Sequence, residues 1–200
     1  MYERYVKRLL DALFSAVLLA LLWPAMAVVA LLIRLETPGP AIFKQKRYGK
    51  DKKFFYIYKF RTMRMDAPRD VDTNRFHDAE NYITPLGRIL RRYSVDELPQ
   101  LINILRGDMS FIGPRPALWN QYDLMEWRDR LGASGVRPGL SGWAQVNGRD
   151  RLGADLEKKA TLDAQYAQNI SLRFDLKCLL WTFIKVVNHQ DIEEGGEDRS

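Results

Sequence analysis

The uncharged, apolar stretch from residue 12 to residue 33 limits the possible folds of this 200-residue chain more than any other feature. At about 1.5 Å per residue it would form a helix about 33 Å long, and the hydrocarbon core of a bilayer is about 30 Å thick. Pro24 follows Trp23 near its centre, where a proline removes one helical hydrogen bond and bends the axis. The stretch therefore predicts a membrane segment that is broken at Trp23-Pro24.

Three interpretations of this stretch are open. Lys7 and Arg8 precede it and Arg34 follows it, so the preference of basic residues for the cytoplasm places both ends there and argues against a straight spanning helix. Residues 25–27 (Ala-Met-Ala) are similar to a signal-peptide cleavage site, but the apolar stretch continues beyond them. In a re-entrant helix each half would be about 17 Å long, which fits one leaflet of about 15 Å. We favour the re-entrant form.

Composition and charge narrow the class of protein. Hydrophobic residues make up 46% of the chain, which is enough for a folded core. The net charge is +6, and basic residues are concentrated between Arg34 and Arg64, directly after the apolar stretch. This placement favours contact with membrane lipid headgroups, a phosphorylated substrate, or both. The sequence contains no zinc-ligand spacing and no nucleic-acid-binding motif, so we do not expect nucleic acid as a partner.

Two short strands are predicted after the Pro-Gly-Pro sequence at residues 38–40. Residues 41–47 and 54–60 are rich in Ile, Phe and Tyr, and the polar residues between them form a turn. Lys59 and Arg61 lie two positions apart at the end of the second strand. Because alternate residues of a strand share a face, we expect both side chains to point towards a site.

Two adjacent carboxylates, Asp96 and Glu97, stand at the start of a predicted helix that ends at Gly107. Its apolar positions follow the spacing i, i+3, i+4, i+7: Leu98, Leu101, Ile102 and Leu105. The start of a helix stabilises negative charge and so favours an ionised Asp96. The alternative is a capping box, in which Ser94 is the N-cap and Glu97 bonds back to its amide. The two roles can coexist.

This carboxylate pair is suited to phosphoryl chemistry. A carboxylate can attack phosphorus to form an acyl phosphate, and a neighbouring carboxylate can bind Mg²⁺ to offset the charge of a diphosphate. Candidate phosphate-binding cations are Arg91 shortly before the pair, Arg115 between two prolines, and Arg137 before a proline. For Arg115 and Arg137 the alternative is an ordinary surface salt bridge.

Four segments of the sequence resemble one family of enzymes. Residues 58–63 (YKFRTM), 94–100 (SVDELPQ), 107–116 (GDMSFIGPRP) and 137–149 (RPGLSGWAQVNGR) together resemble the bacterial sugar transferases. More narrowly, the chain is similar to the small monotopic phosphoglycosyl transferases. The resemblance covers nearly the whole chain in order, and the segments are too long for a chance match.

The resemblance implies a reaction and specific residue roles. The family transfers a phospho-sugar from a UDP-sugar to polyprenyl phosphate and releases UMP. By resemblance, Asp96 is the nucleophile that forms a covalent phospho-sugar intermediate, and Glu97 binds Mg²⁺. Gln145 and Asn147 would bond the amide edge of the uracil, with Arg149 as a phosphate or acid partner. The enzyme would work at the cytoplasmic face of the bacterial plasma membrane.

The resemblance extends to the membrane segment. Family members have a re-entrant helix broken by a proline, usually within a Ser-Pro pair, whereas this chain has Trp23-Pro24. The basic pair and the Asp that the family carries near the start of this helix are matched by Lys7, Arg8 and Asp11.

The C-terminal third is predicted to be helical. Residues 120–131 and 155–168 have charged outer faces, and residues 172–187 form a broad apolar stripe that carries Trp181 and the single cysteine, Cys178. The last helix would pack in the core, or lie in the membrane interface, where Trp and flanking basic residues are favoured. One cysteine excludes an intramolecular disulfide, and a buried thiol is its simplest interpretation.

Together these features predict an α+β, mainly helical monotopic membrane enzyme with a small β-hairpin. We expect a re-entrant membrane helix at residues 1–36, a cytoplasmic catalytic domain at residues 37–189 and a disordered acidic tail at residues 190–200. The rival from another class is a non-enzymatic, membrane-bound scaffold that binds anionic lipid through its basic hairpin. The sequence carries no motif that identifies the sugar, the pathway or an oligomeric state.

Overall fold

The computed structural model describes residues 1–68, 70–71, 79–148 and 155–187. This part of the chain is mainly helical and contains two small sheets of two strands each. Its elements are, in order, η1 (Tyr2–Val6), α1 (Lys7–Glu36), β1 (Ile42–Tyr48), η2 (Lys50–Lys52), β2 (Phe54–Phe60), α2 (Ala79–Tyr82), α3 (Pro85–Arg92), η4 (Val95–Glu97), α4 (Gln100–Arg106), β3 (Ser110–Ile112), α5 (Tyr122–Arg130), β4 (Gly139–Ser141), α6 (Trp143–Val146), α7 (Leu156–Gln168) and α8 (Leu172–Val187).

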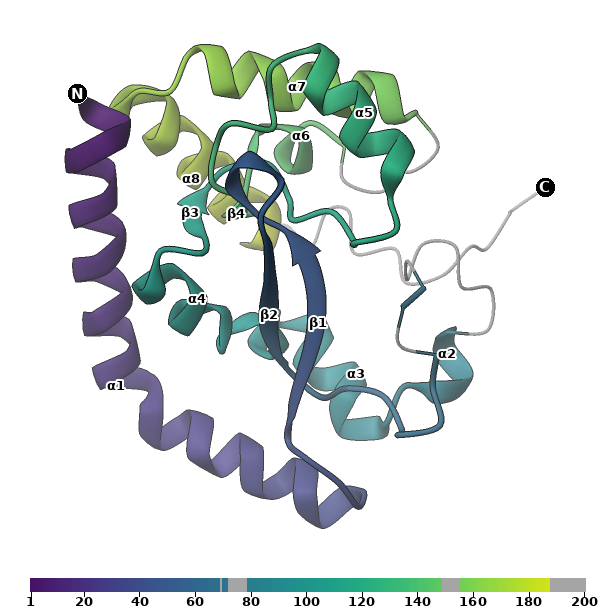
Figure 1. The fold of residues 1–200 in the computed structure, drawn as a ribbon. Coiled ribbons are helices and arrows are strands. Elements are labelled where there is room, and N and C mark those ends of the chain that lie inside the picture. The colour runs from purple at the N-terminus through teal and green to yellow at the C-terminus, as the bar shows by residue number, and fades with distance from the viewer. Residues whose placement is uncertain (69, 72–78, 149–154, 188–200) are drawn as a thin grey trace.

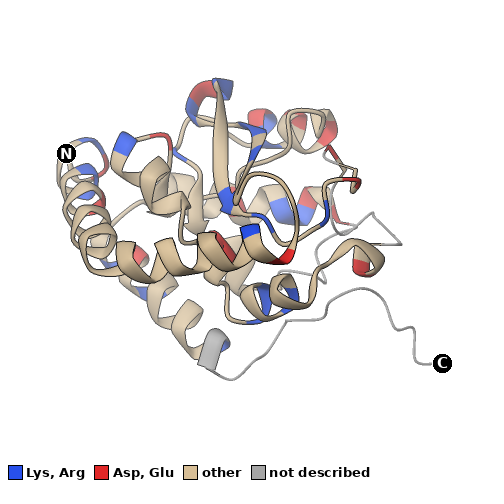
Figure 2. Ribbon diagram, turned by 90° about the horizontal axis from the view of Figure 1, so that it is seen from below, with Lys and Arg blue, Asp and Glu red and all other residues tan. Residues whose placement is uncertain are grey.

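Helix α1 is long, apolar and bent. It has 30 residues with Pro24 inside it, and Figure 1 shows two arms that meet at an angle and border the left and lower edges of the molecule. Trp23, beside the proline, is 63% exposed. In Figure 2 the charged residues of α1 lie towards its two ends. The predicted break at Trp23-Pro24 therefore matches the bend, whose cause is the hydrogen bond that the proline cannot make.

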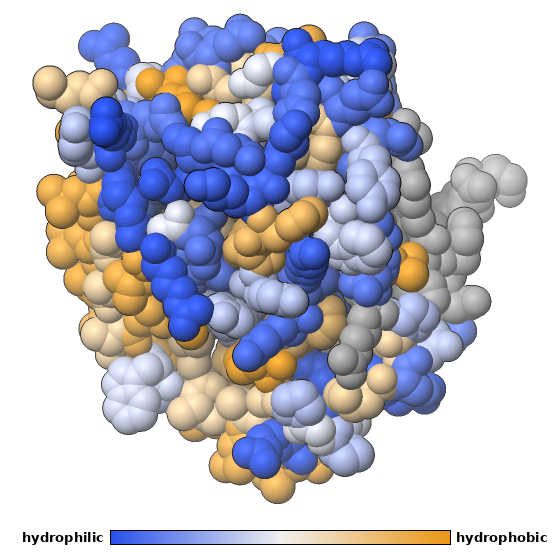
Figure 3. Space-filling model, viewed as in Figure 1, coloured by the Kyte–Doolittle hydropathy of each residue, from blue (hydrophilic) through white to orange (hydrophobic). Residues whose placement is uncertain are grey.

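Most large side chains of α1 are exposed rather than packed. The exposed ones are Leu9, Leu13, Phe14, Val17, Leu21, Trp23, Val28, Leu31, Leu32 and Leu35. Figure 3 shows the resulting hydrophobic surface along the edges of the molecule where α1 runs, whereas the upper part of the same face is largely hydrophilic. By length and composition, α1 is able to cross a membrane. Exposed apolar surface of this extent is typical of a protein or membrane interface.

The first arm of α1 is fastened to the rest of the protein by its charged residues. Lys7 forms a buried ion pair of 2.7 Å with Asp175 of α8. Arg8 donates to the carbonyls of Ile104 and Leu105, in the last turn of α4, over 2.7 and 2.6 Å, and so caps the end of that helix. Asp11 accepts a hydrogen bond from a backbone N–H of β3. These three residues, which the family resemblance singled out, therefore attach the helix to the globular part.

The second arm of α1 is also fastened to the globular part. The Arg61 guanidinium donates to the carbonyls of Ile33, Thr37 and Pro38, where the helix ends. Glu36 accepts a hydrogen bond from a backbone N–H in the first turn of α3. Arg61, which we expected to point towards the site beside Lys59, instead caps α1. The physical reason is that β2 ends one residue before Arg61, so the strand alternation does not extend to it.

The β-hairpin forms where it was predicted. Strands β1 and β2 pair antiparallel, with Ile42 opposite Phe60 at one end and Tyr48 opposite Phe54 at the other. Each observed strand agrees with its predicted range to within one residue at each end. Ile57 and Phe60 are 3% and 2% exposed, and their clusters pack against both arms of α1. The hairpin therefore links the two arms of α1 through the core.

The helix after the carboxylate pair begins later than predicted. The pair lies in the short 3₁₀ turn η4, and α4 begins only at Gln100, after the N-cap Pro99. Leu101 is buried as expected and Ile104 is buried as well, whereas Leu105, expected on the inner face, is 40% exposed. The predicted end is confirmed, because Gly107 follows α4 with φ +91°, which glycine adopts without strain.

Asn103 ties α4 to β2. Its side chain is fully buried, its Oδ1 accepts a hydrogen bond from the Tyr58 N–H at 3.0 Å, and its Nδ2 donates to the Tyr56 carbonyl at 2.8 Å. Both bonds lie within three residues of Lys59, so Asn103 fixes the strand that carries that lysine.

The C-terminal helices form close to their predicted positions, but the apolar stripe of α8 faces outwards. Cys178 and Asp175 are buried against the globular part, as expected for the cysteine. The exposed apolar side chains of α8 are Leu172, Leu176, Leu179, Leu180, Trp181, Phe183 and Ile184. The core-helix interpretation is therefore wrong for this stripe, since only a narrow side of α8 packs inwards. The predicted acidic tail, residues 190–200, lies outside the described residues.

Candidate active site

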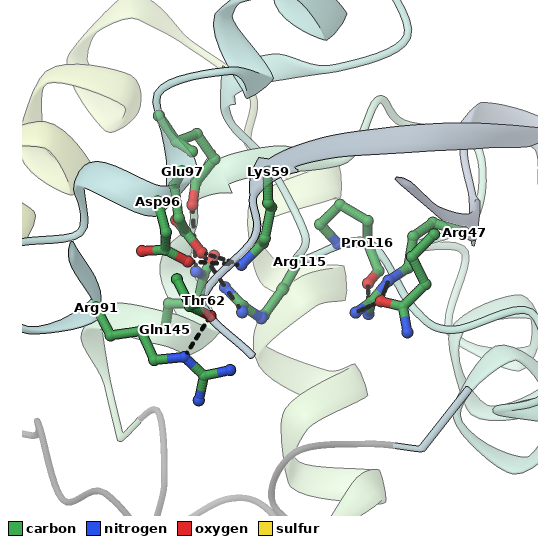
Figure 4. Close-up of polar contacts among 11 residues, drawn as sticks. Arg47, Lys59, Thr62, Arg91, Asp96, Glu97, Arg115, Pro116 and Gln145 are labelled. Carbon is green, nitrogen blue, oxygen red and sulfur yellow. Dashed lines mark hydrogen bonds and ion pairs between the residues drawn. The ribbon is translucent and has the colours of Figure 1, made fainter. Parts of the chain in front are cut away.

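Two carboxylates and two cations meet where β2, η4 and the loop after β3 come together. Lys59 Nζ lies 2.6 Å from Glu97 Oε1 and 3.8 Å from Asp96 Oδ2. Arg115 Nη2 lies 3.7 Å from the same oxygen of Glu97. Figure 4 shows these side chains converging. The structure thus brings together four residues that the sequence separates by up to 56 positions, since 115 − 59 = 56.

The 3₁₀ turn of η4 presents both carboxylates on the same side. Ser94 before it has φ +54°, in the left-handed region, and makes no side-chain capping bond. The predicted capping box is therefore wrong, because Glu97 forms ion pairs with Lys59 and Arg115 instead. The turn is held by the backbone, where the Glu97 N–H donates to the Ser94 carbonyl at 3.2 Å.

Burial and the neighbouring cations act in opposite directions on the pKa of Asp96. This residue is 8% exposed, and burial is the main cause that raises the pKa of its carboxyl group, with the Glu97 charge adding to it. Lys59, then Arg91 and Arg115, lower the same pKa. These cations favour the ionised form, which nucleophilic attack requires.

Burial also lowers the pKa of the Lys59 ammonium, while Glu97 and Asp96 raise it. The cluster therefore combines charges of both signs, of which Asp96 is buried and Lys59, Glu97 and Arg115 are partly exposed.

Arg91 stands at the edge of this cluster. Its Nε donates to Thr62 Oγ1 at 2.9 Å, and its positive charge lowers the pKa of Asp96. Arg91 comes from α3 and Thr62 from the segment after β2 (Figure 4). Arg91, which was selected from the sequence, is thus a third cation near the carboxylate pair.

The donor set is compatible with Mg²⁺ that is bound together with a phosphorylated substrate. Among the residues that the structure describes, no group of three or more His, Cys, Asp or Glu is placed to hold a metal. Mg²⁺ commonly uses one or two carboxylates and completes its shell with water and substrate phosphates. Asp96 and Glu97 supply that number of carboxylates, so Glu97 fits the role of a metal ligand only in the presence of the donor's phosphates.

Arg137 is not brought to the carboxylate pair. Its Nε donates to the Gly107 carbonyl at 3.0 Å, and its side chain lines a small polar cavity beside Lys7 and Asp11. Within the described parts of the chain it forms no ion pair with Asp96 or Glu97. Its hydrogen bond joins the end of α4 to the segment that leads into β4.

The predicted nucleotide-binding residues lie on or after α6. Gln145 Nε2 donates to the Leu140 carbonyl at 3.3 Å, while its Oε1 is buried without a hydrogen-bond partner among the described residues. Such an orphaned acceptor is uncommon and fits a site that binds a ligand donor. Asn147 is exposed, and its Nδ2 donates to the Trp143 carbonyl at 2.7 Å. Arg149 lies outside the described residues.

Several buried polar residues were not selected from the sequence. Arg128 and Asp163 form a buried ion pair of 2.6 Å between α5 and α7. Tyr166 donates to Asp175, the partner of Lys7, at 2.6 Å. Arg128, Asp163 and Tyr166 lie in helices that were predicted to have charged outer faces. No periodicity in a single sequence marks which charged residue of an amphipathic helix is buried.

Comparison with known proteins gives the family. The family model described as "Bacterial sugar transferase" matches residues 2–189. The chain is 39% identical over 191 residues to the UDP-glucose:undecaprenyl-phosphate glucose-1-phosphate transferase of Escherichia coli (strain K12), covering 92% of this chain and 40% of that protein. It is 44% identical over 184 residues to the protein of the same name from Caulobacter vibrioides, covering 88% of this chain and 67% of the relative.

The same family includes a relative of similar length. The uncharacterized sugar transferase EpsL of Bacillus subtilis (strain 168) is 40% identical over 189 residues, which covers 94% of this chain and 91% of that protein. The match thus extends along both α1 and the globular part. From the family match and the identity to these relatives, it follows that this chain belongs to the bacterial sugar transferase family.

Proposed function

We propose that this protein transfers a phospho-sugar from a UDP-sugar to a polyprenyl phosphate through a covalent intermediate on Asp96. The names of the Escherichia coli and Caulobacter relatives describe transfer of glucose 1-phosphate to undecaprenyl phosphate, and a relative from Aeromonas hydrophila is named for N-acetylgalactosamine. The observation that carries the proposal is the buried carboxylate pair with Lys59 and Arg115 within 4 Å of it.

The first half-reaction is an attack of the Asp96 carboxylate on the sugar-bearing phosphorus of the donor. The new bond is an acyl phosphate, and the diphosphate bond to UMP breaks, so UMP leaves with the bridging oxygen. Lys59 and Arg115, which lie within 4 Å of the carboxylate pair, would bind the phosphate oxygens on which negative charge develops. Mg²⁺ bound at Glu97 would offset the charge of the diphosphate and of the leaving UMP.

The second half-reaction returns the enzyme to its starting state. A phosphate oxygen of the polyprenyl phosphate attacks the same phosphorus, the acyl phosphate bond breaks, and the Asp96 carboxylate is released. The product is a polyprenyl-diphosphate sugar. Arg91, whose positive charge lowers the pKa of Asp96, would supply a further cation for the incoming phosphate.

We propose further that α1 enters and leaves the membrane by the same face. Lys7 and Arg8 attach its first arm, and Glu36 attaches its last turn, to one globular part. A spanning helix would place one of these ends across the bilayer from that part. The exposed apolar side chains of α1 and α8 would then lie in the membrane, with residues 37–189 on the cytoplasmic side.

Release of UMP tests the proposed reaction against the lipid-binding scaffold. Purified protein is mixed with polyprenyl phosphate, Mg²⁺ and each of a panel of UDP-sugars, and UMP is measured. The proposal expects release with at least one sugar, and loss of it in Asp96→Asn. Asp129→Asn, at an exposed surface ion pair, is the matched control and should keep its activity. Liposome binding without UMP release for every sugar would favour the scaffold instead.

A further inference from the structure

The loop that carries Arg115 is fixed at each of four successive carbonyls. We call residues 114–117 the Arg115 loop. The bonds are Gly139 N–H to Pro114 O (2.9 Å), Arg128 Nη2 to Arg115 O (3.0 Å), Arg47 Nη1 to Pro116 O (2.9 Å) and Tyr48 N–H to Ala117 O (2.9 Å). The donors come from β4, α5 and β1. A loop with this many long-range bonds holds its backbone in one place.

The bond at Arg115 itself comes from a buried side chain. Arg128, on α5, and Asp163, on α7, have side chains that are 5% and 1% exposed. Arg128 donates to Asp163 Oδ2 from Nε at 2.8 Å and from Nη2 at 2.6 Å. The same Nη2 also donates to the Arg115 carbonyl. One guanidinium therefore joins α5, α7 and the Arg115 loop.

The buried ion pair of Arg128 and Asp163 is not explained by its contribution to stability alone. Removing two charges from water is costly, and an apolar pair of similar volume often stabilises a core as well or better. A guanidinium, however, is a rigid fork that can hold a carboxylate and a carbonyl at the same time. Asp163 fixes the fork of Arg128, and the fork fixes the carbonyl of the residue whose own side chain lies 3.7 Å from Glu97.

We infer that Arg128 and Asp163 are positioning residues, which hold the Arg115 guanidinium in place for the phosphates of the donor. The inference rests on the proposed function, since it assigns the Arg115 side chain to the donor diphosphate. Within the described part of the chain, Arg128 bonds to Asp163 and to the Arg115 carbonyl and not to Asp96 or Glu97, so both residues would act through Arg115. Precise placement matters because a shift of about 1 Å can cost about 100-fold in rate.

The substitution Arg128→Lys separates position from charge. Lysine keeps a cation opposite Asp163, so the carboxylate is not left buried and unpaired, but a single ammonium does not reproduce the fork. The measurement is the single-turnover rate of phospho-sugar attachment to the enzyme, followed by intact mass with the UDP-sugar that the wild type uses. We expect the rate to fall about 10-fold to 100-fold with little change in thermal unfolding.

The matched control lies on the same helix. Arg130 ends α5, is exposed, and pairs with Glu126 four residues earlier. Arg130→Lys makes the same chemical change without touching the Arg115 loop and should keep the wild-type rate. If Arg128→Lys behaves like Arg130→Lys, the positioning role is overturned.

A double-mutant cycle distinguishes positioning from general stability. Once Arg115→Ala has removed the guanidinium, adding Arg128→Lys should cost no further rate, because nothing is left to position. If the two losses multiply, Arg128 acts independently of Arg115 and the inference is wrong. Should Arg128→Lys fail to fold, Asp163→Asn, which keeps the size and one acceptor oxygen of the side chain, replaces it in the same cycle.

The same assay separates failure of this inference from failure of the proposed function. If the wild type acquires no phospho-sugar from any UDP-sugar, the covalent reaction is wrong and the positioning role falls with it. If the wild type and Arg130→Lys react at equal rates while Arg115→Ala is slow and Arg128→Lys is not, only the positioning role is wrong.

Discussion

Lys59 Nζ lies 2.6 Å from Glu97 Oε1, so an ammonium group occupies the contact position beside the carboxylate that we propose as the Mg²⁺ ligand. An ammonium and a divalent cation repel each other and cannot both contact this oxygen closely. If the metal binds through this oxygen, Lys59 has to leave it. The phosphates of the donor offer the lysine a new partner.

Lys59→Met should tighten the binding of a divalent cation when no donor is present, although it should lower turnover. If the neighbouring positive charge opposes the metal by about 1.4 kcal/mol, its removal tightens binding about tenfold. Titration of Mn²⁺, followed by electron paramagnetic resonance, measures this affinity directly. Lys53→Met, at an exposed position of the same hairpin, is the control. Equal Mn²⁺ affinity in Lys59→Met and the wild type would show that the two cations do not compete.

Asn103→Ala should destabilise the fold and also reduce activity. It removes both side-chain bonds to β2, each of which is part-buried. The expected loss is about 1–3 kcal/mol in the free energy of unfolding, since a hydrogen bond of this kind contributes about 0.5–1.5 kcal/mol. Denaturant unfolding in detergent measures it. Asn169→Ala, at an exposed amide, should cost far less, and an equal cost would contradict the role of Asn103.

Cys178 should resist alkylation in the folded protein. Burial, and then the charge of Asp175, raises the pKa of its thiol to about 12, so at pH 8 about one molecule in ten thousand carries the reactive thiolate. Iodoacetamide labelling, followed by mass spectrometry, should be slow in native protein and fast in denaturant. Rapid labelling of the native protein would contradict this burial.

The raised pKa of Cys178 also predicts how the stability of the protein depends on pH. An unfolded chain releases the thiol proton near its ordinary pKa of about 8.5, whereas the folded protein retains it up to about 12. The contribution of Cys178 to stability is therefore complete below about pH 8.5 and is lost as the pH rises towards 12. In Cys178→Ala this component of the alkaline destabilisation should be absent.

Both ends of α1 should be accessible from the cytoplasmic side. In a Cys178→Ala background, a cysteine is introduced at Tyr5, which is 61% exposed before the apolar stretch, and in a second variant at Lys53 on the hairpin. A membrane-impermeant maleimide should label both in inverted vesicles and neither in intact spheroplasts. Labelling of the Tyr5→Cys variant from outside would show that α1 spans the membrane.

The sequence predicts the elements of the site better than the directions of its side chains. The hairpin, the carboxylate pair and the proline-flanked Arg115 were found because turn residues, strand composition and motif spacing are local signals. Arg61 was assigned to the site wrongly, because its direction depends on where β2 ends and on the carbonyls that α1 leaves unpaired. The late start of α4 follows from Pro99.

Two further features depend on tertiary contacts that no local pattern carries. The apolar stripe of α8 was predicted from the sequence. Periodicity alone, however, does not tell whether such a stripe packs in the core or faces outwards, as it does here. Arg128, Asp163 and Asn103 are polar residues in amphipathic helices, and only the packing of α5 on α7 and of α4 on β2 makes them buried. Their partners lie 35 and about 45 positions away, beyond any helical repeat.

The covalent step on Asp96 is tested most directly by intact mass after mixing the protein with Mg²⁺ and its UDP-sugar, without polyprenyl phosphate. The wild type should gain the mass of one phospho-sugar, located by peptide mapping at Asp96, and should lose it when polyprenyl phosphate is added. Asp96→Asn should gain nothing. A wild type that releases UMP in the complete reaction but never carries the adduct, or an Asp96→Asn variant that does carry it, would contradict the account.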